Sequence, residues 1–277
     1  TQILRRVLTA AEVNGSTTTP IKFVLPGVSA DASCDFYVVI NRNIADNITT
    51  KAKLLEELES DIASYNGTYA NVTTKAMRSG GFAMTGTVTA KIVSGTTAVT
   101  VTVKRVVAKV EIQTSMTDSF RTKYGNGCVE VKKITLSRGA EKSYLIDQTA
   151  SKYATVSSSF TSAQDAYCDK TGASKTNAYK YNNLFYINEK AAAATGSRIK
   201  VVLNAVYDAD GNLSTTTDQL AVTYETELTG ATGGKIARNG SYKVNAKLDG
   251  LTGQDVTLAV TVANWDALST QDVNLGQ

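Results

Sequence analysis

The fold is decided by the stretch Ala98-Val-Thr-Val-Thr-Val-Lys-Arg-Val-Val-Ala-Lys-Val-Glu-Ile112. Its first half has valine at the odd positions and threonine between them, whereas after Lys104 and Arg105 the apolar residues occupy the even positions. Successive side chains of a strand point to opposite faces, so this shift reverses which face is buried. A β-bulge would produce the reversal, and so would a chain that leaves one sheet and enters another. We interpret it as the boundary between two β-domains, residues 1–103 and 104–277.

The two halves of this stretch are expected to enter different hydrophobic cores. We predict that the core of the first domain contains Val99, Val101 and Val103. The core of the second domain is predicted to contain the even-numbered set, namely Val106, Ala108, Val110 and Ile112.

Apolar runs with a period of two, or apolar on both faces, predict strands along most of the chain. These runs are Ile3–Val13, Ile21–Leu25, Asp35–Ile40, Phe82–Ile92, Val129–Leu136, Ser143–Ile146, Arg198–Tyr207, Gln219–Glu225, Ser241–Leu248 and Val256–Val262. Residues Phe36–Ile40 are apolar on both faces, which is typical of a central strand. One helix is predicted over Lys51–Ile62, capped by Thr49 or Thr50. The fold class is therefore mainly β, with two antiparallel β-sandwich domains and one short helix in the first.

Composition excludes several classes of function. The 277 residues contain no histidine, the commonest general base and metal ligand. The net charge of +4 is spread along the chain, which argues against nucleic acid as a partner. No apolar run is long enough to span a membrane. We therefore predict that the protein is no enzyme and has no catalytic site, no cofactor and no obligatory metal.

Two smaller motifs leave alternatives open. No CxxC spacing is present, which argues against zinc. A disulfide between Cys128 and Cys168 is one interpretation, and buried or free thiols, Cys34 included, are the favoured one. The segment Asp208-Ala-Asp-Gly-Asn212 resembles a calcium loop in its oxygen spacing. Its glycine stands at the fourth position instead of the sixth, so a hairpin turn is the favoured interpretation.

A long segment of low apolar content, Asp147–Asn183, separates the predicted strands of the second domain. Structureless loops of this length are uncommon and often functional. The segment is interpreted either as a decorated surface loop or as an adhesive surface built on its tyrosines, which are Tyr153, Tyr167, Tyr179 and Tyr181.

Segments spread over nearly the whole chain, taken in order, resemble the fimbrillins, the major pilin subunits of type V pili in Bacteroidales. The matching segments are Phe23-Val-Leu-Pro26 with Phe36-Tyr-Val-Val-Ile-Asn41, the helix Leu54-Leu-Glu-Glu-Leu58, the strand Phe82-Ala-Met-Thr-Gly86, the crossing strand Val103-Lys-Arg-Val-Val-Ala-Lys-Val110, and the closing strands Tyr242-Lys-Val and Val260-Thr-Val-Ala-Asn-Trp265.

This resemblance implies two transthyretin-like β-sandwich domains and a lipoprotein precursor that an extracellular protease cuts after Arg or Lys. Thr1 is then expected to be the residue created by that cleavage. Removal of the first strand opens a groove, and the C-terminal strand of another subunit fills it. The tail at about 266–277 has the composition expected of such a donor strand, with apolar Ala267, Leu268, Val273 and Leu275.

The function implied is that of a structural pilin subunit on the outer membrane surface, outside the cell, that supports adhesion and colonisation. Its partners would be identical pilin subunits in a filament and accessory or anchor pilins. The alternative is a tip or accessory adhesin that binds a host glycan or host protein.

Overall fold

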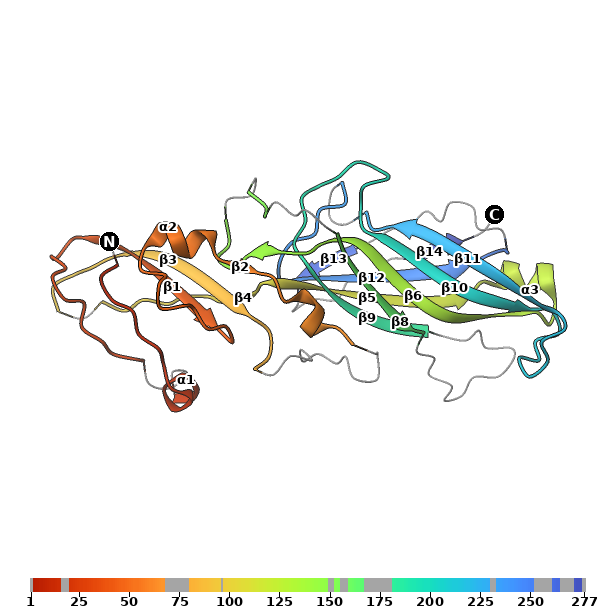
Figure 1. Cartoon of the computed structure of the whole chain (residues 1–277), viewed down its shortest axis with the longest axis horizontal. Helices are drawn as coiled ribbons and strands as arrows, with labels where there is room; N and C mark the ends of the chain where they lie inside the picture. The colour runs from red at the N-terminus through yellow and green to blue at the C-terminus, as the bar shows by residue number, and fades with distance from the viewer. Residues whose placement is uncertain are drawn as a thin grey trace.

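The computed structural model describes residues 2–15, 20–67, 80–95, 97–148, 152–154, 159–166, 181–229, 233–251, 261–264 and 272–275. The fold is mainly β with several antiparallel sheets, as predicted. The molecule is elongated, with a small sheet at one end and a larger pair of sheets along the remainder (Figure 1).

The small sheet contains β1 (Ser33–Ile40), β3 (Met84–Lys91) and β4 (Lys104–Arg105), in the order β1-β3-β4 with antiparallel pairing. β1 is therefore an edge strand, and the prediction that Phe36–Ile40 forms a central strand is wrong for this chain. Within the described residues, β3 is the strand partner of β1, and the other edge of β1 has none. These residues supply one three-stranded sheet in the first part of the chain.

Position 86 in β3 has no room for a side chain, which accounts for the glycine in the Met-Thr-Gly segment. A Cβ atom placed on Gly86 would lie 2.2 Å from the backbone oxygen of Thr102 and 3.0 Å from a methyl group of Val101. The chain before β4 thus runs against β3 so closely that a side chain is excluded. Residues 97–103 make this approach without being part of a strand.

The first part of the chain contains two short α-helices instead of one. The predicted strand Ile3–Val13 is wrong, because α1 (Ala10–Gly15) occupies its second half. Thr9 and Glu12 form a reciprocal capping box: the Glu12 amide donates to the Thr9 hydroxyl, and the Thr9 amide donates to the Glu12 carboxylate over 2.9 Å. Ile21–Leu25 is likewise not a strand.

The second helix, α2 (Lys51–Glu56), begins as predicted and ends early. Thr50 caps it, with its hydroxyl accepting from the Lys53 amide over 3.2 Å. Beyond Glu56 the predicted helix is replaced by the two-residue strand β2 (Leu58–Glu59) and the 3₁₀ helix η1 (Ile62–Tyr65). β2 pairs with β7 (Ser143–Tyr144), and this distant pairing competes successfully with local helix formation.

The larger part is a sandwich of two sheets. One sheet has the order β11-β10-β6-β8, and the other has the order β13-β12-β5-β9 with β14 also paired to β12. The bounds are β5 Val107–Met116, β6 Cys128–Ala140, β8 Ser159–Asp165, β9 Tyr181–Asn188, β10 Lys200–Asp208, β11 Gln219–Glu227, β12 Gly240–Leu248, β13 Thr261–Asn264 and β14 Asp272–Leu275.

Two features of the sandwich differ from the prediction. β8 lies inside the segment that was expected to be a long loop, and α3 (Asp118–Tyr124), capped by the Thr117 hydroxyl, follows β5. β12 pairs with β5 in parallel. Both strands begin beside the small sheet, where the Asn239 amide donates to the Val107 oxygen over 3.0 Å, and they run in the same direction from there.

The reversal of faces predicted at Lys104 is present in the burial pattern. Val99, Val101 and Val103 are half-buried while the residues between them are exposed. Val106 and Val107 are both buried, and beyond them the even positions from Ala108 to Met116 are buried. The chain changes sheets here, since β4 belongs to the small sheet and β5 to the sandwich. The division into two domains at residue 104 stays a prediction.

The sandwich core is aromatic and its hydroxyl groups are bonded. Tyr186, Tyr224, Tyr242, Phe120 and Phe185 are fully buried. The Tyr224 hydroxyl donates to the Gly250 oxygen over 2.9 Å, and the Tyr242 hydroxyl accepts from the Ala237 amide over 2.8 Å. A buried hydroxyl without a partner would cost about 1–3 kcal/mol, so these bonds permit large side chains in the core.

A buried arginine ties the two parts together. The side chain of Arg238 is 5% exposed, and its guanidinium donates to the backbone oxygens of Tyr144 and Leu145 over 2.8 and 3.2 Å. The same group pairs with Glu189 at 2.5 Å. The Leu145 oxygen also accepts from the Thr85 hydroxyl of β3 over 3.0 Å. Sandwich and small sheet therefore meet in a bonded junction, within which Ala83, Val106 and Leu145 are buried together.

Replacing Arg238 with methionine should destabilise the protein by about 3–5 kcal/mol, because the Glu189 carboxylate is left buried without its partner. Urea unfolding followed by circular dichroism measures the change. Lys132→Gln, which removes an exposed pair with Glu130, is the matched control and should change stability by less than about 1 kcal/mol. Equal effects of the two substitutions would contradict a structural role for Arg238.

Candidate functional site

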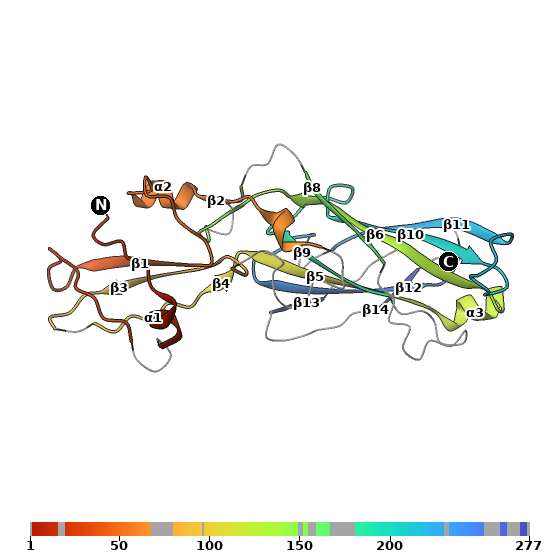
Figure 2. The same ribbon diagram turned by 60° about the horizontal axis from the view of Figure 1, so that its bottom comes forward.

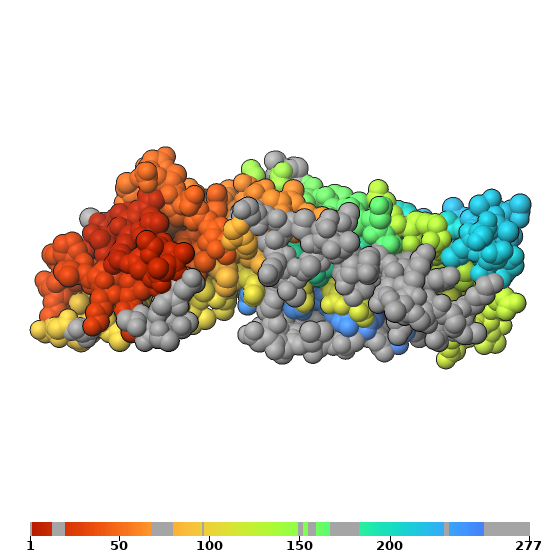
Figure 3. Space-filling view, turned by 90° about the horizontal axis from the view of Figure 1, so that it is seen from below, coloured from red at the N-terminus to blue at the C-terminus, as the bar shows by residue number. Residues whose placement is uncertain are grey.

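Exposed apolar side chains gather at the small-sheet end of the molecule. Of the eight large apolar side chains that are exposed in the described residues, seven lie in this part: Ile3, Leu4, Val7, Leu8, Phe23, Val24 and Val93. Figure 3 shows this N-terminal part as a separate mass at one end of the molecule. Contiguous apolar patches mark surfaces that bind other proteins, so this end of the molecule is the first place to look for such a surface.

The small sheet is also poorly covered. Cys34 is the fully buried side chain of β1, and all five residues of Phe36–Ile40 are half-buried. An edge strand exposes unpaired N–H and C=O groups and invites a further strand. The apolar residues on both faces of β1 suit a strand with a neighbour on each side, and the described residues provide one neighbour. β1 thus lies at the edge of its sheet although its side chains are those typical of a central strand.

The predicted donor tail supplies a short strand at the edge of the sandwich. β14 pairs in parallel with its own β12, from Asn245↔Asp272 to Leu248↔Leu275. β13 occupies the first half of the same edge, from Gly240 to Lys243. The isolated chain therefore pairs the backbone of Val273 and Leu275 with its own sandwich. A parallel pairing of four residues is a weak attachment.

The open edge of β1 and strand β14 lie far apart. β12 begins at the junction with the small sheet and ends at Leu248, whose oxygen accepts from the Thr117 amide next to α3. Since β14 pairs with the last part of β12 and runs in the same direction, it points away from the small sheet. Figure 2 shows β1 and β3 in one half of the molecule and β14 in the other.

The remaining predicted site residues are placed as follows. Thr1, Ala267, Leu268, Tyr167 and Tyr179 lie outside the described residues. Lys104 and Arg105 form β4 at the crossing, where Arg105 bonds to the Asn239 side chain and its guanidinium carbon lies 5.9 Å from the centre of the Phe82 ring. Tyr153 is half-buried, and Tyr181 begins β9 with its backbone paired to Thr114. The proposed adhesive grouping of the four tyrosines therefore stays a prediction.

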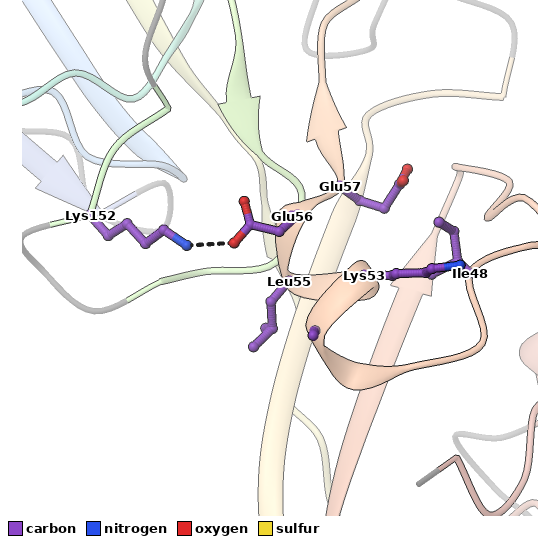
Figure 4. Close-up of a pocket in the computed structure, with 7 residues that line it drawn as sticks. Ile48, Lys53, Leu55, Glu56, Glu57 and Lys152 are labelled. Carbon is purple, nitrogen blue, oxygen red and sulfur yellow. Dashed lines mark hydrogen bonds and ion pairs between the residues drawn. The ribbon is translucent and has the colours of Figure 1, made fainter.

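A shallow, open depression of about 570 Å³ lies beside α2 (Figure 4). Its lining is mostly apolar and comes from 48–57 together with Lys152. The Lys152 amine bonds to Glu56 over 2.9 Å, and this bond raises the pKa of Lys152. A lysine acts as a nucleophile when its pKa is lowered, so this amine is unsuited to covalent chemistry.

The side chains whose pKa is shifted by burial, Lys190, Tyr186 and Tyr224, belong to the packed interior or its hydrogen bonds. Burial, followed by the nearby charge of Arg138, lowers the pKa of Lys190, whose amine donates to the Arg138 and Ser197 oxygens. Burial raises the pKa of Tyr186 and of Tyr224, both in the sandwich core. No described helix has the length and apolar character needed to cross a bilayer.

The cysteines are consistent with the interpretation as buried residues as far as they are described. Cys34 and Cys128 are 8% and 4% exposed. Cys168, the suggested disulfide partner of Cys128, lies outside the described residues, so the pairing stays untested.

Solved structures share this fold. A "putative cell adhesion protein" from Bacteroides eggerthii superposes with a TM-score of 0.52 at 16% identity, covering 87% of this chain and 78% of its own. A protein of the same description from Parabacteroides distasonis gives 0.51 at 12% identity, covering 84% and 75%. The tip fimbrial protein Mfa3 from Porphyromonas gingivalis gives 0.48 at 14% identity, covering 83% and 80%.

These structural neighbours are consistent with the fimbrillin-like family that the sequence resembles, and at such low identity the likeness is one of fold. No protein-family model matches the chain, and no curated protein matches it.

The attachment of β14 can be measured by hydrogen exchange with mass spectrometry. Backbone amides of 272–275 should exchange much faster than those of β11, because β11 is an edge strand with nine antiparallel pairs to β10 and β14 has four parallel pairs to β12. Equal protection of the two strands would show that β14 is a fixed part of the sandwich.

Proposed function

We propose that this protein is a structural subunit of a fimbria, exposed on the cell surface, which polymerises when the C-terminal tail of one subunit pairs with β1 of the next. The observation that carries the proposal is the position of β1: it has the apolar side chains of a central strand and a strand partner at one edge. A strand supplied by a neighbouring subunit would give β1 its second partner by β-augmentation.

The geometry suits a filament. A donor at one end of the molecule and an acceptor at the other make a heterologous contact, which repeats without closing. Its bonded junction, with Arg238 at the centre, allows such a subunit to act as a rigid segment.

Exchange is favourable if the acceptor pairs more of the tail than β12 does. Leaving β12 breaks four parallel residue pairs. In the acceptor, each valine or leucine that becomes buried would add about 1.5–3 kcal/mol to the binding free energy. Each hydrogen bond between the strands would add a net contribution of about 0.5–1.5 kcal/mol. Val273 and Leu275 share a face by the period-two rule, with Ala267 on the same parity, so one face of the donor can be buried.

The predicted role as a non-enzyme fits this proposal. Arg238 and Glu189, two largely buried charged residues of the junction, pair with each other. The Arg238 guanidinium also donates to two backbone oxygens, and the Glu189 carboxylate accepts from the Ser143 hydroxyl. Cleavage before Thr1, a lipoprotein precursor and an outer membrane location are further parts of the proposal that rest on the family resemblance.

A tip or accessory adhesin is the alternative function. Such a subunit would accept a donor strand and end the filament, and its ligand would be a host glycan or protein. We prefer the stalk subunit because the edge position of β1 and the short pairing of β14 supply both an acceptor and a donor.

Deletion of Asp266–Gln277, or the pair Val273→Asp with Leu275→Asp, should give folded monomers that no longer form filaments, because charged side chains cannot enter an apolar acceptor. Electron microscopy and size-exclusion chromatography measure assembly. Asn274→Asp is the matched control: it adds a charge on the opposite face of the strand and should leave polymerisation largely intact. Normal filaments from the truncated protein would refute exchange of the tail.

A further inference from the structure

Three carboxylates meet at the turn between β10 and β11. Asp208 is the last residue of β10, Asp218 directly precedes β11, and Asp210 lies in the turn between them. One oxygen atom of each carboxylate lies within 4.8 Å of one oxygen of each of the others. The strands hold this arrangement, since Asp208 is the register partner of Gln219.

Each carboxylate uses one oxygen for the turn. Asp208 Oδ2 accepts from the Gln219 side chain over 3.1 Å, Asp210 Oδ1 from the Asn212 amide over 2.6 Å, and Asp218 Oδ2 from the Asp210 amide over 3.0 Å. The second oxygens of Asp208 and Asp218 are buried and have no hydrogen-bond partner. The turn is thereby fixed while its remaining oxygens are left for another ligand.

Among the described residues, no counter-charge is paired with this cluster. Asp208 is fully buried. No lysine or arginine nitrogen in the described part of the chain forms an ion pair with any of the three carboxylates. A buried carboxylate without a partner is costly, and like charges at this separation add to the cost. A cation bound between the three groups removes both penalties.

We propose that this turn binds one calcium ion through Asp208, Asp210 and Asp218. Calcium takes oxygen ligands at about 2.3–2.6 Å, so two oxygens on one ion lie at most about 5 Å apart, as these do. Carboxylate oxygens on an irregular turn suit calcium better than zinc, which takes nitrogen and sulfur, or magnesium, which demands a near-ideal octahedron.

The turn is seated against its neighbour. Gly211 has a φ of +74°, and a Cβ atom there would lie 2.4 Å from the backbone oxygen of Asn126, in the turn between α3 and β6. The ion would therefore fasten the β10–β11 hairpin beside α3, at the end of the sandwich remote from β1. Sequence analysis favoured a hairpin turn over a calcium loop, and the turn is present; Asp218, ten positions after Asp208, completes a ligand set that does not follow the EF-hand spacing.

The test uses the full-length protein after removal of metal with EDTA. Calcium should raise the melting temperature with an affinity of about 10⁻⁴–10⁻³ M, the range of extracellular calcium modules. Terbium should bind in place of calcium and emit on excitation of tyrosine, because Tyr207 is adjacent to Asp208 and lies 5.7 Å from Tyr124 between ring centres.

Asp208→Asn and Asp218→Asn should each abolish the calcium-dependent shift and the terbium emission, while Asp46→Asn, an exposed aspartate of the small-sheet part, should preserve both. Should Asp208→Asn fail to fold, Asp210→Asn at the exposed position provides the same comparison. An unchanged melting temperature in the wild type, an equal response to magnesium, or calcium binding retained in the variants would overturn the proposal.

Discussion

Side chains of an extended chain alternate between two faces, and this constraint governs how the two parts of the molecule are joined. One continuous run, residues 97–116, lies against β3 with its odd positions turned inward and then enters the sandwich with its even positions turned inward. The change requires one place where neighbours are both buried, and Val106 and Val107 are those neighbours. The junction is consequently packed around the crossing, with Arg238 bonding the segment that pairs with β2.

β1 and β14 lie at opposite ends of the molecule and make the two ends different. β1 has a more apolar character than an edge strand needs, and β14, like β13, is held to β12 by four residue pairs, fewer than the pairings among the longer sandwich strands. The proposed filament rests on these two features at opposite ends of the molecule. The proposed calcium site at the β10–β11 turn belongs to the same end as β14, so a metal ion there would stiffen the part from which the tail departs.

Strong period-two patterns made most of the sandwich predictable from the sequence. The alternating pattern predicted six strands at positions that the structure confirms: β3, β5, β6, β10, β11 and β12. The helix predicted over Lys51–Ile62 was cut short because β2 finds a partner 85 positions away in β7, a contact that local propensity cannot reveal. The helix α1 was missed although its signal, Thr9 and Glu12 in a capping box, is present in the sequence.

The residues of the proposed calcium site and of the buried ion pair were less predictable, since they depend on where distant segments meet. Asp218 joins Asp208 across a hairpin, and Glu189 meets Arg238 from another strand connection. The prediction that β1 is a central strand was wrong for a different reason. Its side chains are those of a strand with two neighbours, and the chain described here provides one.

The alignment of the strands with the long axis has a mechanical consequence. Tension between the small sheet and the far end of the sandwich enters through β5, which is bonded along its length to β12 and β9 (Figure 1). Such a load acts in shear: the hydrogen bonds of the ladder are strained together and cannot be opened one by one from an end. The force that the subunit withstands is then set by its unfolding barrier and much less by its equilibrium stability.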